Sequence, residues 1–138
     1  MNAQTPLTFG QRVFLALDCV PLIVVLGLIA MYLSLLQPRF GGPVLPPYVM
    51  AGILILVRGP ATLAHLRDLT RGVALIDEDR LEGFGRAGHH RQSSWGQFAT
   101  LGRLWMTAGV LLPGRKGHRH RITYSPASRI AWRLEPLD

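Results

Sequence analysis

Four histidines in the second half of the chain are the side chains best suited to hold a metal ion. His89 and His90 are adjacent, while one residue separates His118 from His120. Imidazole nitrogens bind zinc, copper and iron, so the two pairs would form a site if their segments met. Adjacent residues of a strand point to opposite faces, however, and neither segment contains an acidic residue. We therefore predict no metal site and expect exposed loop histidines, with metal binding as an alternative.

His65 lies near the end of the second apolar segment of the chain. A histidine at this position is able to ligate a haem iron, as a subunit of an electron-transfer complex would require. Such a role, or metal binding by the loop histidines, defines one alternative function: a small redox or metal-binding subunit of a membrane complex. A single histidine at a helix end more commonly caps the helix or lies at the interface, so we predict no cofactor.

The sequence contains residue types found in several catalytic sites, but not their spacing. The candidate serine nucleophiles are Ser93, Ser94, Ser125 and Ser128. None of them lies in a G-x-S-x-G or S-x-x-K motif. Gly83, Gly85 and Gly88 match G-x-G-x-x-G, but the HHRQSS that follows does not begin a helix, as a dinucleotide site requires. Asp77 and Asp79 share a strand face, and we interpret them as turn and solubility residues. We predict that the protein is not an enzyme.

The elements that would position these residues fall into two parts. Apolar residues make up 49% of the sequence, yet 19 of the 23 charged residues follow His65. The 18 residues from Cys19 to Leu36 are uncharged and would extend about 27 Å as a helix. Tyr48 to Leu66 is the second apolar segment, close to the length that a bilayer requires. We predict a transmembrane helical hairpin over residues 1–69, with spans at about 13–36 and 48–66.

Prolines and glycines indicate where the hairpin turns and bends. Gln37 to Pro47 contains four prolines and two glycines, so the chain can reverse there. Arg58, Gly59 and Pro60 interrupt the second segment, which predicts a kinked crossing; the alternative is a short helix that bends into the interface at Gly59. A cleaved signal sequence is a further alternative, but only Arg12 precedes the first run and no small-x-small cleavage site follows it.

Basic residues near the span ends predict the orientation of the hairpin. The connecting loop holds only Arg39, whereas Arg58, Arg71 and the whole downstream region lie beyond it. By the positive-inside rule we expect a multi-pass protein of the bacterial cytoplasmic (inner) membrane with both termini cytoplasmic. Tyr32 and Tyr48 would then lie at the outer interface. The single cysteine excludes an internal disulfide.

Asp18 and Arg58 are the two charged residues within or beside the predicted spans, and intramembrane charges are functional candidates by default. Measured from Tyr32 and Tyr48, their heights differ by about 6 Å, which an arginine could bridge. Helical side chains lean toward their own N-terminus, however, and in an antiparallel hairpin this separates the two groups. We favour charges that are solvated or paired with another subunit, with a direct ion pair as the alternative.

After Arg67 the pattern changes to short alternating runs, which predicts a cytoplasmic basic β domain over residues 70–138. We expect strands at 72–77 and 81–86 separated by a turn at Glu78–Arg80, one or two strands within 95–106, and a short helical turn within 107–117. HRITYS and RIAWRLE predict a final hairpin with its turn at 125–128. Five short strands indicate a small antiparallel β-barrel-like domain, of SH3-like or OB-like size.

The β domain is strongly basic. Between Gly83 and Leu134 there are nine basic residues and no acidic one. A cationic domain tethered to the inner leaflet is attracted to anionic lipid headgroups. The residues we expect to provide this surface are Arg115, Lys116, Arg119 and Arg121. The predicted function is a non-catalytic accessory or scaffolding protein whose β module contacts anionic lipid or a protein partner, including a second copy of the chain.

A membrane-tethered nucleic-acid-binding module is the second alternative. Trp95, Phe98 and Trp105 are interleaved with arginines, as base-stacking platforms require. No RNP-like or helix-turn-helix signature accompanies these aromatic residues, and we interpret them as core residues of the β domain. Nucleic acid is therefore not an expected partner.

Several short motifs have a common order along most of the chain, from Val13 to the end. They are Val57-Arg58-Gly59, the DLxxG of Asp68–Gly72, Pro113-Gly114, the YSPxSR of Tyr124–Arg129 and the LEP of Leu134–Pro136. In this order, after two apolar helices, the chain resembles uncharacterised bacterial two-span membrane proteins with a C-terminal small β domain. The resemblance implies a fold and a location, and it implies no activity, substrate or catalytic residue.

Overall fold

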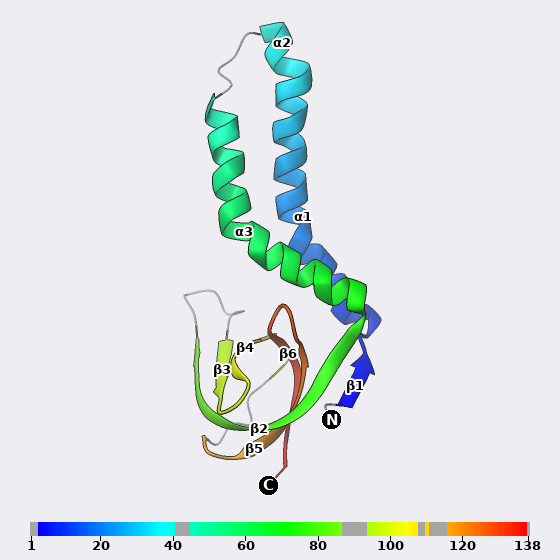
Figure 1. Ribbon diagram of the computed structural model, residues 1–138, viewed down its shortest axis with the longest axis vertical. Coiled ribbons are helices and arrows are strands. Elements are labelled where there is room, and N and C mark those ends of the chain that lie inside the picture. The colour runs from blue at the N-terminus through cyan, green and yellow to red at the C-terminus, as the bar shows by residue number, and fades with distance from the viewer. Residues whose placement is uncertain (1–2, 41–44, 87–93, 108–109, 111–115, 138) are drawn as a thin grey trace.

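The computed structural model describes residues 3–40, 45–86, 94–107, 110 and 116–137. Within them, two long apolar helices precede a β-rich region (Figure 1). Helix α1 (Phe9–Met31) continues through a π-helical segment (Tyr32–Leu36) into the short α2 (Gln37–Phe40), and α3 is Leu45–Arg71. The strands are β1 Ala3–Pro6, β2 Val73–Arg86, β3 Ser94–Phe98, β4 Gly102–Met106, β5 Arg119–Ser125 and β6 Ile130–Pro136.

Both helices are longer at the end near the sheet than the predicted spans of 13–36 and 48–66. Helix α1 begins at Phe9 because Thr8 and Gln11 form a capping box: the Thr8 side chain accepts from the Gln11 backbone N–H, and the Gln11 side chain accepts from that of Thr8. Figure 1 shows α3 bending partway along, so that its second part runs across the end of the strands. Pro60 lies inside this helix, and a proline removes one backbone hydrogen bond and kinks a helix.

The strands form one six-stranded sheet in the order β1-β2-β3-β4-β6-β5, with β2 also paired to β5. Most pairs are antiparallel, but β4 and β6 are parallel, through Trp105 with Ile130 and Met106 with Ala131. The prediction of a wholly antiparallel domain is therefore wrong at this pair. A parallel pair needs a crossover connection, and here β5 lies between the two strands in the sequence.

Strand β2 corrects the predicted turn at Glu78–Arg80. One strand of 14 residues runs through these acidic positions and pairs with β5 from Leu75 to Arg80 and with β3 from Leu81 to Arg86. The register shifts between Leu81 and Gly83, as at a β-bulge, and a bulge bends a strand. The acidic residues are tolerated inside the strand because Glu78 faces Arg121 of β5 across the pair.

The N-terminal strand β1 was not predicted. It pairs with β2 from Ala3 opposite Ile76 to Pro6 opposite Val73. Leu7 continues this pairing by donating its N–H to the Gly72 carbonyl. The prediction placed residues 1–69 in the hairpin, but Ala3–Pro6 belong to the sheet. Strand β1 leads directly into α1 and α3 leads directly into β2, so each helix is joined to a strand.

The last hairpin was predicted correctly. Strands β5 and β6 pair antiparallel, and the residues between Ser125 and Ile130 form the turn. The loop expected around His89 and His90 and the predicted helical turn within 107–117 lie largely outside the described residues.

Apolar side chains are buried in two clusters. The larger lies inside the sheet and consists of Leu81, Phe98, Leu104, Met106, Ile122, Tyr124, Ala131 and Leu134. The smaller joins helix to sheet: Leu7, Leu15, Ala74 and Ile130, with Leu69 and Trp132 packed against them. Phe14 of α1 adds an edge-to-face contact with Trp132, with ring centroids 5.5 Å apart. These contacts place the sheet against the base of the hairpin.

Candidate functional site

A cavity of about 650 Å³ lies where the two helices meet strands β4 and β6. Its apolar lining comes from Phe14, Ala61, Ala64, Trp105, Met106 and Ile130. Its polar lining comes from Asp18, Arg58, His65, Thr107 and Ser128. Three residues singled out in the sequence for their chemistry, Asp18, Arg58 and His65, are therefore brought together by the fold.

His65 and Asp18 form the closest charged contact of this cavity. The Nδ1 atom of His65 lies 3.1 Å from the Oδ2 atom of Asp18. The ring is buried, whereas the Asp18 side chain is 46% exposed. Although the two atoms are close, this buried nitrogen has no hydrogen-bond partner in the described part of the chain. The contact was missed in the sequence because each residue was considered alone.

The predicted alternative of a direct ion pair between Asp18 and Arg58 is not formed. Among the described residues the partner of Asp18 is His65, and the Arg58 guanidinium makes no side-chain hydrogen bond or ion pair. The two opposite charges nevertheless line the same cavity. An arginine beside apolar walls and a half-exposed carboxylate are able to bind a charged ligand from two sides.

Asp68 fixes the wall of the cavity that the sheet provides. Its side chain is completely buried, and its two carboxylate oxygens accept hydrogen bonds from the backbone N–H groups of Ala127 and Ser128, at 3.0 and 2.7 Å. On the same turn, the Trp132 indole N–H donates to the Ser125 hydroxyl at 2.8 Å. The β5–β6 turn is thereby attached to α3. Thr62, His65 and Asp68 are buried on α3, and their three-residue spacing is the signal that could have indicated this contact in the sequence.

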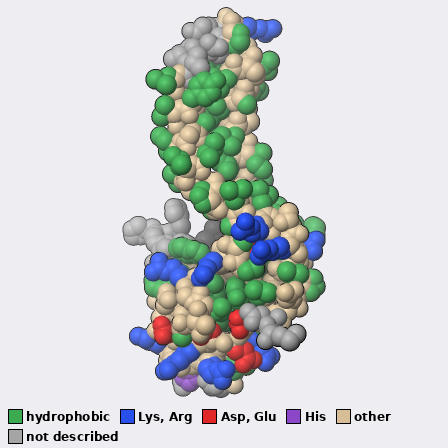
Figure 2. Space-filling view, viewed as in Figure 1, with side chains coloured by type: hydrophobic (Ala, Val, Ile, Leu, Met, Phe, Trp, Pro, Cys, Tyr) green, Lys and Arg blue, Asp and Glu red, His purple; other side chains and the backbone are tan. Residues whose placement is uncertain are grey.

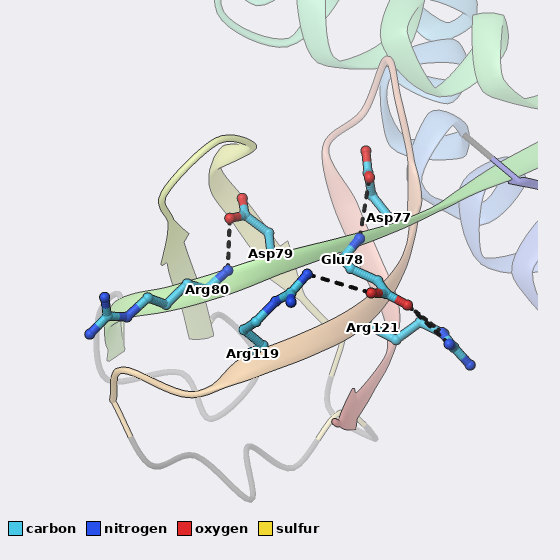
Figure 3. A network of polar contacts seen from close by, with 6 residues as sticks. All are labelled: Asp77, Glu78, Asp79, Arg80, Arg119 and Arg121. Atoms are coloured by element: carbon cyan, nitrogen blue, oxygen red, sulfur yellow. Dashed lines mark hydrogen bonds and ion pairs between the residues drawn. The ribbon is translucent and has the colours of Figure 1, made fainter. Parts of the chain in front are cut away.

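The basic residues predicted to contact lipid lie elsewhere. The Glu78 carboxylate of β2 accepts a hydrogen bond from Arg121 of β5 at 3.0 Å and forms an ion pair with Arg119 of β5 at 3.6 Å (Figure 3). These side chains lie on the part of the sheet away from the helices, and Lys116 is exposed just before β5 (Figures 1 and 3). Arg115 lies outside the described residues. If the helices cross a bilayer, this surface faces the aqueous phase rather than that bilayer.

Of the four predicted loop histidines, the structure describes His118 and His120. His89 and His90 lie outside the described residues. His120 is a fully buried strand residue, which corrects the expectation of an exposed loop histidine, and its Nδ1 atom lies 3.0 Å from the His118 carbonyl oxygen. Within the described ranges, no three histidine, cysteine or acidic side chains are grouped as metal ligands.

Asp79 is a buried residue inside strand β2, which corrects its interpretation as a turn and solubility residue. Its carboxylate accepts the backbone N–H groups of Arg80, Thr100 and Leu101 at 2.7 to 2.8 Å. These bonds hold the β3–β4 turn against β2. Gly85 lies within β2 beside the Trp95 ring, where a Cβ atom would come within 2.6 Å of that ring. Neither residue belongs to a nucleotide-binding loop.

The aromatic residues divide between the core and the surface. Phe98 is fully buried, as predicted for a core residue. Trp95 and Trp105 lie opposite each other on β3 and β4, and the Arg103 guanidinium stacks 4.4 Å from the Trp95 ring centroid. Trp105 is 41% exposed and lines the cavity under the helices, so the expectation that it is a core residue is wrong.

One titratable group inside the sheet is perturbed. Burial raises the pKa of the Tyr124 phenol above its ordinary value of 10.0; the nearby Asp77 carboxylate also raises this pKa, and Arg129 partly offsets the two effects. The phenol is therefore held in its neutral form in the core.

Comparisons with known proteins add no assignment to this geometry. No family model, no curated protein and no solved structure matches the chain. The resemblance to two-span membrane proteins with a small β domain accordingly stays a prediction.

Proposed function

We propose that the chain is a non-catalytic integral membrane protein whose helical hairpin crosses the bilayer twice and holds a small β module at one membrane surface, as an accessory or scaffolding subunit. One observation carries this proposal: the apolar side chains of the hairpin are exposed. In the most apolar 18-residue windows of the two helices, only 17% and 11% of residues are buried, at mean hydropathies of 2.7 and 1.6. Figure 2 shows apolar side chains along the hairpin.

The exposed apolar side chains of the hairpin must be shielded from water by lipid or by a protein partner. Soluble monomers rarely expose a contiguous apolar patch larger than a few hundred Å². Here the exposed side chains include Leu17, Ile23 and Val24 of α1 and Ile53 and Leu56 of α3. Lipid covers a two-helix hairpin on all its outer faces, and each helix has the length required to cross the hydrocarbon layer.

The positions of four arginines support insertion of the helical hairpin into the bilayer up to the ends of the helices that meet the sheet. Arg12, Arg67 and Arg71 are exposed near the ends of α1 and α3 that meet the strands, Arg58 is exposed at the middle of α3 beside the cavity, and Figure 2 shows basic side chains at this junction. Basic residues at this level favour a cytoplasmic β module with both termini cytoplasmic. They also replace the β5 arginines as the residues expected to contact anionic headgroups, since they lie next to the hairpin.

The module suits an accessory role because it is attached rigidly. The buried Asp68 carboxylate, the smaller apolar cluster and strand β1 all join helix to sheet, so a bound partner would be held at a fixed position over the membrane. The pairings β2-β3-β4-β6-β5-β2 return to the first strand, and we propose that the module is a closed five-stranded barrel of OB-like order with β1 added.

The aqueous side of the module offers Lys116, Arg119 and Arg121, and we propose a protein partner with an acidic surface there. Glu78 contacts two of the three and offsets one of their three positive charges, which weakens this cationic surface. The Arg103–Trp95 stack is the observation that favours a nucleic-acid ligand instead. Its neighbour Trp105 lines the cavity under the helices, which leaves little room for a strand of nucleic acid beside the membrane.

Extraction of cell membranes with alkaline carbonate tests the membrane proposal. The full chain is expected to stay in the membrane pellet. Ile53→Arg places a charge on an exposed face of α3 and is expected to shift a large part of the chain to the soluble or aggregated fraction, because a central arginine costs about 2.5–3.5 kcal/mol on insertion. Leu137→Arg makes a similar change on the module and should have no effect. Extraction of the unaltered chain would refute the proposal.

Cross-linking in native membranes tests the accessory role. Reagents that join acidic to basic side chains are expected to give one discrete adduct through the module. Arg119→Glu together with Arg121→Glu should abolish it while the reacting amine of Lys116, the single lysine of the sequence, is kept; Arg133→Glu, a change on β6, should not. An adduct that forms equally in both variants would contradict the proposed surface.

A further inference from the structure

We propose that the cavity between the helices and the sheet binds the headgroup of a zwitterionic aminophospholipid, with the lipid phosphate at Arg58 and its ammonium group at Asp18. This inference rests on the proposed membrane insertion of the hairpin. The proposed ligand occupies a cavity that the hairpin does not need in order to anchor the module to the membrane.

The carrying observation is that opposite charges share a cavity without pairing. Arg58 and Asp18 both line it, and no ion pair between them exists in the described structure. The Asp18 side chain is 46% exposed, and its only charged neighbour in the described residues is the imidazole of His65. Charged groups beside low-dielectric walls are costly unless they are compensated. A ligand that carries both a phosphate and an ammonium group satisfies both residues at once.

His65 supplies a further polar atom. Its side chain is 9% exposed, and its Nδ1 atom has no hydrogen bond among the described residues. Buried polar atoms of native proteins are nearly always hydrogen-bonded, so an unsatisfied nitrogen at this place calls for a partner. A phosphate oxygen of the lipid would accept a hydrogen bond from this nitrogen. The Asp18 carboxylate would also accept one if it moved slightly when the lipid ammonium group bound to it.

The remaining lining suits the part of a lipid next to its headgroup. Phe14, Ala61, Ala64 and Ile130 are apolar, and Trp105 has an apolar body with one polar N–H, as residues at membrane interfaces often do. Thr107 and Ser128 add hydroxyl groups on the side of the sheet. The cavity lies where the exposed apolar faces of the helices begin, so acyl chains would continue along the hairpin.

Fluorescence quenching of Trp105 by brominated lipid tests the proposal on the full chain. All three tryptophans, at 95, 105 and 132, lie in the β module, so the difference between the wild type and Trp105→Phe isolates the cavity signal. The chain is reconstituted in phosphatidylcholine bilayers containing a minor fraction of lipid brominated near the glycerol. Three brominated lipids are compared in separate samples: phosphatidylethanolamine, phosphatidylcholine and phosphatidylglycerol.

We expect phosphatidylethanolamine to occupy the cavity with about fivefold preference over the other two lipids, because only its primary ammonium donates to Asp18. Asp18→Asn should reduce this preference to the level of phosphatidylcholine. Arg58→Gln should lower Trp105 quenching by all three phospholipids. Arg39→Gln, the same charge change on α2 at the opposite end of the hairpin and outside this cavity, is the matched control and should leave every value unchanged.

Equal quenching by the three lipids would overturn the proposal, as would a phosphatidylethanolamine preference that survives Asp18→Asn. Preference for phosphatidylglycerol would also overturn it and would indicate a purely anionic ligand. Each variant is compared with the wild type by thermal unfolding, so that a misfolded variant is not counted. Failure of the chain to enter the bilayers would instead refute the membrane proposal, which distinguishes the two outcomes.

Discussion

Replacement of Asp68 by asparagine should loosen the attachment of the module to α3. The carboxylate is fully buried and accepts two backbone N–H groups of the β5–β6 turn, at 3.0 and 2.7 Å. Asparagine has nearly the same shape but only one acceptor oxygen, so its amide group would face the second N–H. A hydrogen bond to a charged group contributes about 1.5–3 kcal/mol, and an unsatisfied buried donor costs about 1–3 kcal/mol. We expect a loss of about 3 kcal/mol.

Hydrogen exchange of the chain in detergent micelles measures this loss directly. A change of about 3 kcal/mol corresponds to about a hundredfold in an equilibrium constant. The amides of Ala127 and Ser128 should therefore exchange about a hundredfold faster in Asp68→Asn, while amides of β3 and β4 change little. Glu135→Gln is the control, since this carboxylate pairs with Arg133 at the surface and contributes less than about 1 kcal/mol. Unchanged exchange at Ala127 and Ser128 would refute the assigned role of Asp68.

Two further predictions concern the sheet. Because the raised pKa of Tyr124 means that the folded chain holds the phenolic proton more tightly, this contribution is present below pH 10 and lost as pH rises through the folded pKa. Thermal unfolding above pH 10 should show a decline in stability that Tyr124→Phe reduces; an identical decline would contradict this. Gly85→Ala should displace the Trp95 ring from β2 and destabilise the sheet by about 1–3 kcal/mol, seen as altered Trp fluorescence and a lower Tm, whereas Gly83→Ala, which meets open space, should not.

The parts of the fold that were predictable are those encoded in local pattern. The two apolar helices follow from uninterrupted runs such as Cys19 to Leu36, and the β5–β6 hairpin follows from strict alternation around a Ser-Pro turn. Helix ends were less accurate because capping by Thr8 and Gln11 extends α1 beyond its apolar residues. In each case the signal and the structure it specifies involve neighbouring residues.

The parts that were missed depend on contacts distant in the sequence. Strand β1 is short, and its extended conformation depends on backbone pairing with β2. The run Glu78–Arg80 has the composition of a turn, and only pairing with β5 keeps it extended. The parallel pairing of β4 with β6 likewise has no local pattern.

The candidate site was found residue by residue but not as an arrangement. Asp18, Arg58 and His65 were each identified by their charge or chemistry in an apolar setting. Their common cavity depends on the bend of α3 and on the sheet beneath it. Asp68 was recognised only as part of a motif, because its bonds reach residues about 60 positions later.

Labelling of single cysteines in intact cells tests the two-span hairpin most directly. In a Cys19→Ser background, Arg39→Cys marks the end of the hairpin at α2, and Lys116→Cys marks the module. A membrane-impermeant maleimide is expected to label Arg39→Cys in intact cells and Lys116→Cys only after lysis. Labelling of both positions from the same side of the membrane would contradict a hairpin that crosses the bilayer twice.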